Sequence, residues 1–354
     1  MTLIDKNNAS PERTLLAPDV PALLVLPRLR VQNANAISSP MTWGFPAMSA
    51  FLGFMTALAR MLGKESGINF LAVGVVCHDF EAQVTSEGYT RAFHLTRNPV
   101  LDDGSTAGIV EEARAHLELT LVFDVELDTV NIGPEQREAL AHRIADAAAG
   151  MRLAGGSVMP LLPNAPRRSQ KALKASLELL ADDAGGQQKQ FRRLARRCLP
   201  GFALVSRDDL LAQLLGDLQA DKPAADVLDA WLDLSRWNQR CIDGKWVADK
   251  RQGWTVPIPV GYVGLSELHA SGTVAGARDS GTPFRFVETL WSIGQWVSPH
   301  RLQGLDDLLW YAQQEGAGDD GDKPIYRCRN DYKPSPPRSD AANTGALAVA
   351  ATAV

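Results

Sequence analysis

The order of secondary-structure elements predicted for the first 206 residues constrains the fold more than any other feature. Short aliphatic runs predict strands, and apolar residues spaced by three and four predict helices. The resulting order is strand Leu23–Leu26, helix Pro46–Met61, strand Phe70–Cys77, strand His116–Phe123, helix Pro134–Met151 and, after a glycine-rich turn, the apolar run Val158–Leu161. This order fits an α+β unit of the ferredoxin-like β-α-β-β-α-β type, which is also the plan of an RNA-recognition domain.

An insertion is predicted between the second and third strands, at about residues 80–112. Apolar and polar residues alternate from Phe80 to Thr85, a turn signal follows at Ser86-Glu87-Gly88, and Ala92–Arg97 runs back. This pattern is typical of a projecting β-hairpin rather than of a core element.

The second half of the chain predicts a C-terminal α+β region and then a tail. Its expected elements are a strand at Phe202–Ser206, helices at Arg207–Leu218 and Asp226–Trp237, an edge strand or extended turn at Trp254–Tyr262 and a helix at Pro283–Trp296. We therefore expect a disordered lead-in (1–19), an RNA-recognition-like domain carrying the insertion (20–206), a C-terminal α+β region (207–312) and a disordered tail (313–354).

A long polar stretch, residues 27–46, connects the first strand to the first helix. It contains amides, hydroxyls, two arginines and one tryptophan, and it contains no aspartate or glutamate. A connection that carries donors and an aromatic ring without carboxylates suits a phosphodiester chain better than a metal or a cationic substrate. Because polar loop residues surround Trp43, we expect it to be the exposed exception among the eight tryptophans.

The charges exclude a bulk electrostatic attraction to nucleic acid, because 36 Lys and Arg face 41 Asp and Glu and the formal net charge is −5. The charge is segregated, however: residues 152–197 hold ten bases and three acids, whereas residues 101–146 hold eleven acids and three bases. This pattern predicts a face for a polyanion and an opposite, solvated face. Four arginines at 192–197 lie at helical spacing, which fits an anionic partner or a solvated helix face equally well.

Several other chemistries find little support. The four cysteines lie far apart without a CxxC pair, so neither a zinc site nor a disulfide framework nor another cofactor is expected. No signal peptide or membrane-spanning apolar run is present, which predicts a cytoplasmic protein without membrane contact. The turn at Gly155-Gly156 follows a helix, so it is either a helix-capping turn or a backbone that could approach a phosphate.

Ten sequence blocks resemble those of a known family, and they follow one another in the same order over about residues 20–305. The blocks are residues 27–46, Cys77–Gln83, Leu95–Pro99, Gly104–Thr106, Ile109–Glu118, Met151–Ser157, Leu199–Arg207, Trp254–Pro259, Arg285–Glu288 and Ser298–Arg301. They closely resemble the second subunit of the type I-F CRISPR surveillance (Csy) complex, the tail subunit in the Cascade RAMP superfamily. Residues 1–19 and those beyond about 310 carry no family pattern, and residues 161–190 and 219–250 match weakly.

This resemblance implies a non-catalytic subunit with a modified RNA-recognition (RAMP) fold and a projecting thumb. Members of the family pair with the large subunit and hold the 5′ handle of the guide RNA. They also abut the first backbone subunit, and their thumb kinks the guide and its target DNA near the first spacer positions. Guide maturation in this family belongs to a separate nuclease, and sequence reading comes from base pairing.

The matched blocks suggest residue roles on a single-stranded handle. Amides would meet splayed bases, Trp43 would stack, arginines would meet phosphates, and two glycines would allow close approach of the backbone. The full set of expected RNA-binding residues is Arg28, Arg30, Gln32, Asn33, Asn35, Ser38, Ser39, Trp43, His78, Arg97, Arg114, Arg152, Gly155, Gly156, Ser157, His300 and Arg301.

Two other functions remain open from the sequence. A metal-independent endoribonuclease that processes guide precursors could use His78, His116 or His300 as acid or base, although a hydrogen-bonded structural histidine is the more common situation. A protein-only adaptor would ignore the 5′ handle altogether.

Overall fold

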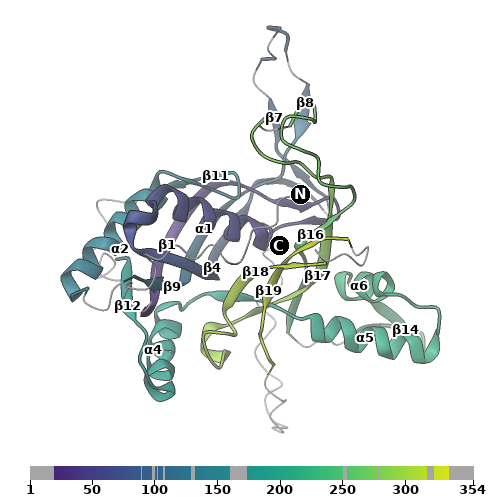
Figure 1. Cartoon of the computed structure of the whole chain (residues 1–354). Coiled ribbons are helices and arrows are strands. Elements are labelled where there is room, and N and C mark those ends of the chain that lie inside the picture. The colour runs from purple at the N-terminus through teal and green to yellow at the C-terminus, as the bar shows by residue number, and fades with distance from the viewer. Residues whose placement is uncertain are drawn as a thin grey trace.

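A large antiparallel sheet runs through the computed structural model, which describes residues 20–334 except 89, 98–99, 102, 107, 129–131, 160–173, 250–252, 278 and 317–322 (Figure 1). Within the described residues its strand order is β10-β11-β1-β9-β4-β13-β17-β16-β19-β18, and β12 also pairs with β1. Helices flank this sheet, so the chain has a mixed α+β architecture. Among these same residues, no helix is both long enough and apolar enough to cross a membrane.

The N-terminal half supplies one side of the sheet and the two helices that cover it. Its elements are β1 (Val20–Asn35), α1 (Met48–Leu62), η2 (Lys64–Ser66), β4 (Ile68–Ala82), β9 (Arg114–Leu127), α2 (Pro134–Ala149), β10 (Arg152–Leu153), β11 (Gly156–Met159) and β12 (Ser176–Leu179). Helix α1 presents Phe51, Met55 and Leu58 to the sheet at the expected helical spacing. Helix α2 begins at a proline, whose fixed φ suits the first turn, and contributes Ile144 to the same core.

In the described part of the chain, one helix packs on the opposite face of these strands, at one end. Helix α4 (Ala184–Arg197) packs Phe191 and Leu194 against Leu23 and Val25 of β1. Residues 22–27 are consequently buried on both faces of the strand, whereas β1 alternates between buried and exposed from Leu29 onward. Among the described residues, α4 therefore covers only the end of this face near Leu23 and Val25.

The C-terminal half closes a ring of strands. Its elements are β13 (Phe202–Ser206), α5 (Asp208–Asp221), α6 (Val227–Ser235), β14 (Gln239–Ile242), β15 (Lys245–Ala248), β16 (Trp254–Gly264), β17 (Val287–Val297), η3 (Pro299–Arg301), β18 (Leu309–Glu315) and β19 (Ile325–Asn330). Strand β18 pairs with β4 at Val73 and Gly74, so β4, β13, β17, β16, β19 and β18 surround a common interior. Trp310 is fully buried there, and its indole Nε1 donates to Leu204 O at 2.8 Å.

Two expectations for this half are wrong. The helix expected at Pro283–Trp296 is strand β17, which pairs with both β13 and β16. Strand β19 lies inside the segment expected to be a disordered tail, but it pairs with β16 and β18 and buries Cys328. The composition of β17 is compatible with a helix as well as a strand, and long-range pairing stabilises both β17 and β19.

The prolines of β16 have the environment that the sequence suggested. Pro257 and Pro259 face β17, while β19 pairs with β16 only from Gly261 to Val263. The proline-containing half of β16 is therefore an edge, where a missing N–H costs no ladder hydrogen bond.

The predicted insertion leaves the main sheet after Ala82, which is the last residue of β4 to pair with β9. It forms two short ribbons, β5 (Val84–Glu87) with β6 (Thr90–Phe93) and β7 (Leu95–Arg97) with β8 (Ile109–Glu111). The β7–β8 ribbon projects well beyond the body of the molecule (Figure 1).

Candidate nucleic-acid interface

The polar stretch after the first predicted strand is mostly a strand itself. β1 extends to Asn35, so the expectation of a connection over residues 27–35 is wrong. Leu29 and Val31 are buried while Arg30 and Gln32 are exposed, which is the alternation of a half-buried strand. The alternation of apolar and polar residues is visible in the sequence, but the polar composition of residues 27–46 favoured the interpretation as a connection.

Two bulges interrupt β1 at two of the expected RNA-binding residues. The register with β9 shifts between Leu26 and Leu29 and again between Val31 and Ala34. Arg28 has φ +53° and Asn33 has φ +58°, both in the left-handed region that L-residues seldom adopt. Each bulge re-aims its side chain toward the face opposite α1 and α2.

Cross-strand pairing brings several expected residues together on that face. Arg30 lies opposite both Glu118 of β9 and Met159 of β11, and Gln32 lies opposite Ser157. Residues directly opposite on antiparallel strands share a face of the sheet. We call this surface the open face, and we define it by Arg28, Arg30, Gln32, Asn33, His78, Asp79, Glu81, His116, Glu118, Arg152 and Ser157.

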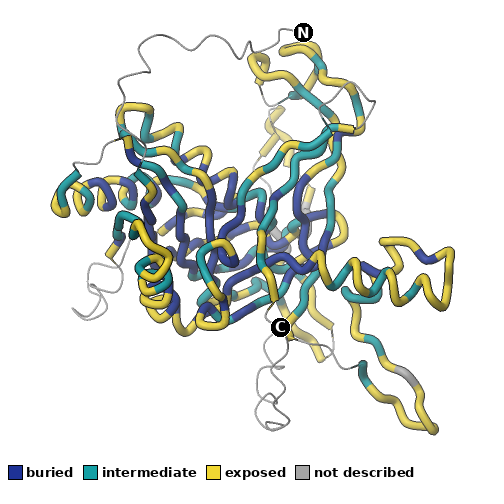
Figure 2. Tube along the Cα trace, turned by 60° about the horizontal axis from the view of Figure 1, so that its bottom comes forward, coloured by how far each residue is buried: buried dark blue, intermediate teal, exposed yellow. Residues whose placement is uncertain are grey.

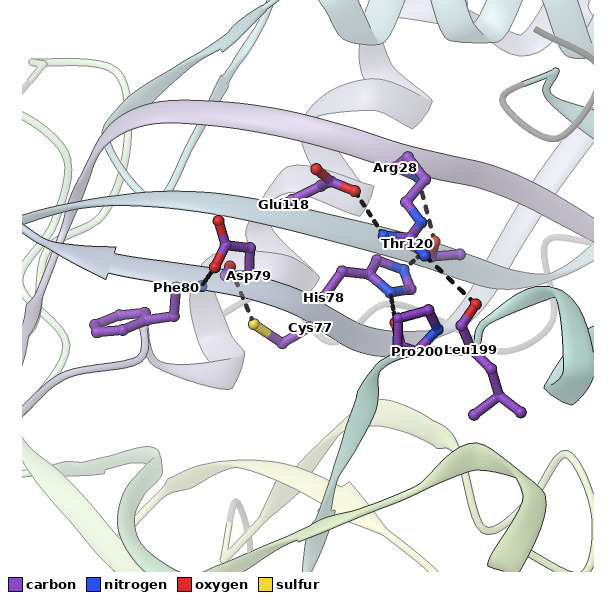
Figure 3. A network of polar contacts seen from close by, with 9 residues as sticks. All are labelled: Arg28, Cys77, His78, Asp79, Phe80, Glu118, Thr120, Leu199 and Pro200. Atoms are coloured by element: carbon purple, nitrogen blue, oxygen red, sulfur yellow. Dashed lines mark hydrogen bonds and ion pairs between the residues drawn. The ribbon is translucent and has the colours of Figure 1, made fainter. Parts of the chain in front are cut away.

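A hydrogen-bond network joins the open face to the segment that precedes β13 (Figure 3). Arg28 Nη1 contacts Glu118 Oε1 at 2.7 Å, and the Arg28 backbone N–H donates to Thr120 Oγ1 at 3.2 Å. His78 Nε2 lies 2.7 Å from the same Thr120 oxygen, and His78 Nδ1 lies 2.7 Å from Pro200 O. His78 therefore links β4, β9 and the start of β13.

The partners of His78 define its protonation. Pro200 O can only accept, so Nδ1 carries the proton, and Nε2 of the neutral ring accepts from the Thr120 hydroxyl. Burial lowers the pKa of His78, and the neighbouring Arg28 cation acts in the same direction. His78 is thus a neutral, structurally engaged side chain at neutral pH.

A second polar cluster lies where β1 meets the base of the insertion. Gln83 Nε2 lies 2.6 Å from Asn33 Oδ1 and 3.0 Å from His116 Nε2, and the Asn33 N–H donates to His116 Nδ1 at 3.3 Å. Our sequence reasoning missed Gln83 and Glu118 as members of this surface and considered His116 only as a possible catalyst. The alternation of His116, Glu118 and Thr120 with leucines was the signal that could have revealed this face.

The remaining connection folds on itself as the short hairpin β2 (Ile37–Ser39) and β3 (Thr42–Trp43). The Asn35 amide bonds the backbone of Ile37 through both its nitrogen and its oxygen, and the Ser38 hydroxyl lies 2.8 Å from Thr42 Oγ1. Ser39 is buried, and its hydroxyl accepts from Trp291 Nε1 at 2.9 Å. The side chains of Asn35 and Ser38 therefore stabilise the conformation of this connection. The buried Ser39 hydroxyl is not accessible to an external ligand.

Trp43 is exposed to 48%, as expected, and its edge-to-face contact with Phe93 of β6 has a centroid separation of 5.6 Å. It is not the exception among the tryptophans, however. Trp237, Trp246 and Trp254 are exposed to an equal or greater extent.

The glycine-rich turn belongs to a β-hairpin, so the interpretation as a helix-capping turn is wrong. Helix α2 has already ended at Ala149, and Ala154 (φ +48°) and Gly155 (φ +76°) form the turn between β10 and β11. A Cβ on Gly156 would lie 2.7 Å from Gln32 O and from Ala34 N. The close approach that Gly156 permits is therefore to β1.

The other expected arginines have different environments. Arg114 Nε donates to Glu112 Oε2 at 3.0 Å, and Arg152 Nε donates to Gly155 O at 3.0 Å. Arg97 ends β7, and its side chain lies outside the described part of the structure. Arg30 is exposed and has no ion-pair or hydrogen-bond partner for its side chain among the residues that the structure describes.

His300 and Arg301 lie apart from the open face. They are exposed in η3, which follows β17 and sits beside α4, where Gln188 Nε2 donates to Gln303 O at 2.8 Å. His300 Nδ1 lies 2.9 Å from Ser298 Oγ. The arginines of residues 192–197 are exposed on the same helix α4, and Arg193 forms an ion pair with Glu178.

Acidic side chains border the acid-free stretch. Glu118 pairs with Arg28, Glu112 pairs with Arg114, and Asp79 and Glu81 lie opposite Glu118 and His116 across β4 and β9. The absence of carboxylates from residues 27–46 does not make the surrounding surface acid-free. Across residues 20–334, apart from the gaps given above, no group of three or more His, Cys, Asp or Glu is arranged to hold a metal ion.

Comparison with known proteins agrees with the resemblance seen in the sequence. The family model described as CRISPR-associated protein (Cas_Csy2) matches residues 24–328, so it ends within β19 and extends beyond the blocks recognised above. The chain is also 47% identical over 322 residues to the CRISPR-associated protein Csy2 of Pseudomonas aeruginosa (strain UCBPP-PA14). That alignment covers 87% of this chain and 95% of the relative. The chain therefore belongs to the Csy2 family of the type I-F CRISPR system.

Proposed function

We propose that this protein is a non-catalytic, cytoplasmic subunit of the type I-F RNA-guided surveillance complex and that its open face binds the 5′ handle of the guide RNA. Family membership supports a role in the Csy complex. The observation that carries the RNA proposal is the exposed row of Arg30, Gln32 and Asn33 on a sheet face that α4 leaves uncovered. A cation beside amides can meet a phosphate and the bases next to it.

The strand order supports a modified RNA-recognition fold of the RAMP type. Read along the sheet, β11, β1, β9 and β4 are the fourth, first, third and second strands of the β-α-β-β-α-β unit. This is the antiparallel order of a ferredoxin-like sheet, with α1 and α2 packed on one face. In RNA-recognition domains the other face binds single strands, and here that face is the open one.

The environment of the candidate histidines favours a binding role over cleavage. Both ring nitrogens of His78 are engaged by Thr120 and Pro200, and its lowered pKa makes the neutral ring a weak base that is seldom protonated at neutral pH. His116 and His300 each have a ring nitrogen bonded within the fold. We therefore retain the endoribonuclease only as an outcome of the test below.

We further propose the partners that the family resemblance implies: the large subunit beside the handle, the adjacent backbone subunit, and target DNA near the first spacer positions. The projecting ribbons of residues 83–112 support a thumb that reaches the guide–target duplex. Trp43 contacts Phe93 of this insertion, so a ring stacked on RNA would lie close to the thumb.

The test measures the affinity of the reconstituted large-subunit pair for a labelled 5′-handle RNA at fixed salt. The double variant Arg30→Ala/Gln32→Ala should bind roughly 10-fold or more weakly, since direct contacts of this kind contribute about 1–3 kcal/mol each. Arg143→Ala, an exposed arginine on α2, is the matched control and should bind like the native chain.

Two results would contradict the proposal. Handle binding by the double variant at native affinity would remove the open face from the interface, and a pair that ignores the handle would favour the protein-only adaptor. A separate experiment incubates the protein with repeat RNA in EDTA. Cleavage of the RNA at a discrete position would favour the endoribonuclease.

A further inference from the structure

Helices α5 and α6 and the β14–β15 hairpin project from one end of the molecule (Figures 1 and 2). We call residues 208–249 the arm. It is attached to β13, β16 and β17, whereas the open face is built on β11, β1, β9 and β4. A partner could therefore occupy the arm without displacing RNA from the open face.

The arm is anchored through α6. Trp231 is buried, its indole Nε1 donates to Ser292 O of β17 at 3.1 Å, and its ring centroid lies 6.2 Å from that of Trp291. At the other end of α6, Asn238 Nδ2 donates to Asp233 O at 3.1 Å and so connects the base of the hairpin to the helix. The arm therefore has a defined attachment at α6.

Large apolar side chains are exposed on both α6 and the hairpin of the arm. Trp237 is exposed to 76% and Trp246 to 72%, and exposed aliphatic side chains accompany them at Leu228, Leu232, Ile242 and Val247. In the described part of the chain, β14 and β15 pair only with each other. A lone two-stranded hairpin is marginally stable in water, and exposed apolar patches that contain tryptophan are typical of protein interfaces.

The net negative charge of the arm indicates which class of partner it can bind. Residues 208–249 contain nine aspartates and four Lys or Arg, a formal charge of −5, and two of the aspartates, Asp208 and Asp209, form ion pairs with Arg327 and Arg207 outside the arm. Asp217 and Asp221 are exposed one helical turn apart on α5. Such a field repels phosphates, so base stacking on Trp237 and Trp246 is disfavoured, and it attracts a surface rich in Lys and Arg.

We infer that the arm is a docking site for a partner protein that presents an apolar recess rimmed by basic side chains. The tryptophans fill the recess, and the aspartates pair with its rim. This inference takes the partner from the assembly proposed above, but it does not depend on RNA binding by the open face.

The experiment uses the full chain and, as the probe, the purified remaining protein subunits of the type I-F complex with guide RNA. The double variant Trp237→Ala/Trp246→Ala should weaken assembly roughly 30-fold or more, as loss of central tryptophan anchors does at interfaces. Leu268→Ala, which changes an exposed apolar residue outside the arm, should assemble like the native chain. Asp217→Lys/Asp221→Lys should also weaken assembly and reduce its sensitivity to salt.

Hydrogen exchange of the native chain supplies a readout that needs no variant. Amides of residues 237–248 should exchange more slowly in the assembled complex than in the isolated chain. The inference is overturned if these amides are unprotected after assembly, or if the tryptophan variant assembles with native affinity. Protection caused by self-association, or by RNA or DNA alone, also overturns it. Handle binding is measured in the same samples, so a failure of the open-face proposal is scored separately.

Discussion

The arginines of the open face differ in what surrounds their guanidinium groups. Arg28 is paired with Glu118 at 2.7 Å, whereas Arg30 is exposed without a described partner. A phosphate would reach Arg30 directly, but at Arg28 it would compete with a carboxylate. RNA binding should therefore depend on Arg30 more than on Arg28.

This contrast predicts a variant that strengthens RNA binding. Glu118→Gln keeps the shape of the side chain and removes a negative charge from the open face. Handle affinity should rise roughly two- to fivefold, because a partly exposed charge contributes about 0.2–1 kcal/mol. Glu135→Gln, on the exposed side of α2, is the control for a change in net charge alone. Weaker binding by Glu118→Gln would mean that the Arg28–Glu118 pair itself shapes the RNA contact.

The backbone approach at Gly156 predicts a stability effect. Gly156→Ala places a methyl group 2.7 Å from Gln32 O and Ala34 N, so β1 and β11 must separate. We expect a loss of about 1–3 kcal/mol in the free energy of unfolding. Gly53→Ala, in α1 with open space around its Cβ, should instead gain about 0.5–1 kcal/mol. Denaturant unfolding of both variants decides the point, and an unchanged midpoint for Gly156→Ala would show that the hairpin can move freely.

At the scale of elements, the sequence predicted those whose signal is local. The helices expected at Pro46–Met61 and Pro134–Met151 correspond to α1 and α2, and the strand Phe202–Ser206 has the same bounds as β13. β17 was mistaken for a helix because its aromatic and aliphatic residues also satisfy helical spacing. β19 follows glycines and acids that resemble a tail, and only pairing with β16 and β18 makes it a strand.

The position of β19 predicts the effect of truncation. A chain that ends at Pro334 keeps every described strand, and it should unfold in one cooperative transition. A chain that ends at Gly316 lacks β19, leaves β16 and β18 unpaired along one edge, and uncovers the interior around Trp310. That chain should lose cooperative unfolding in a thermal melt followed by circular dichroism. Equal melts for the two chains would contradict the role assigned to β19.

At the scale of the whole molecule, strands distant in sequence create the candidate site. Composition directed attention to Arg30, Gln32 and Asn33, which are exposed on the open face. Gln83, His116 and Glu118 reach the same surface only because β9 lies between β1 and β4. The sequence alone could not predict that Arg28 forms an ion pair with Glu118. It also could not predict that η3, which carries His300 and Arg301, lies beside α4 and not on the open face. The first outcome depends on the register between β1 and β9, and the second depends on the packing of η3 beside α4.

The most direct test of the central claim is photo-crosslinking of a 5′-handle RNA, carrying photoreactive bases, in the complete type I-F complex. Mass spectrometry then identifies the crosslinked peptides of this chain. The account predicts crosslinks within residues 28–43 and around His116, with none on the outer surfaces of α1 and α2. Crosslinks confined to those helices, or an absence of crosslinks to β1 in a complex that retains its RNA, would contradict it.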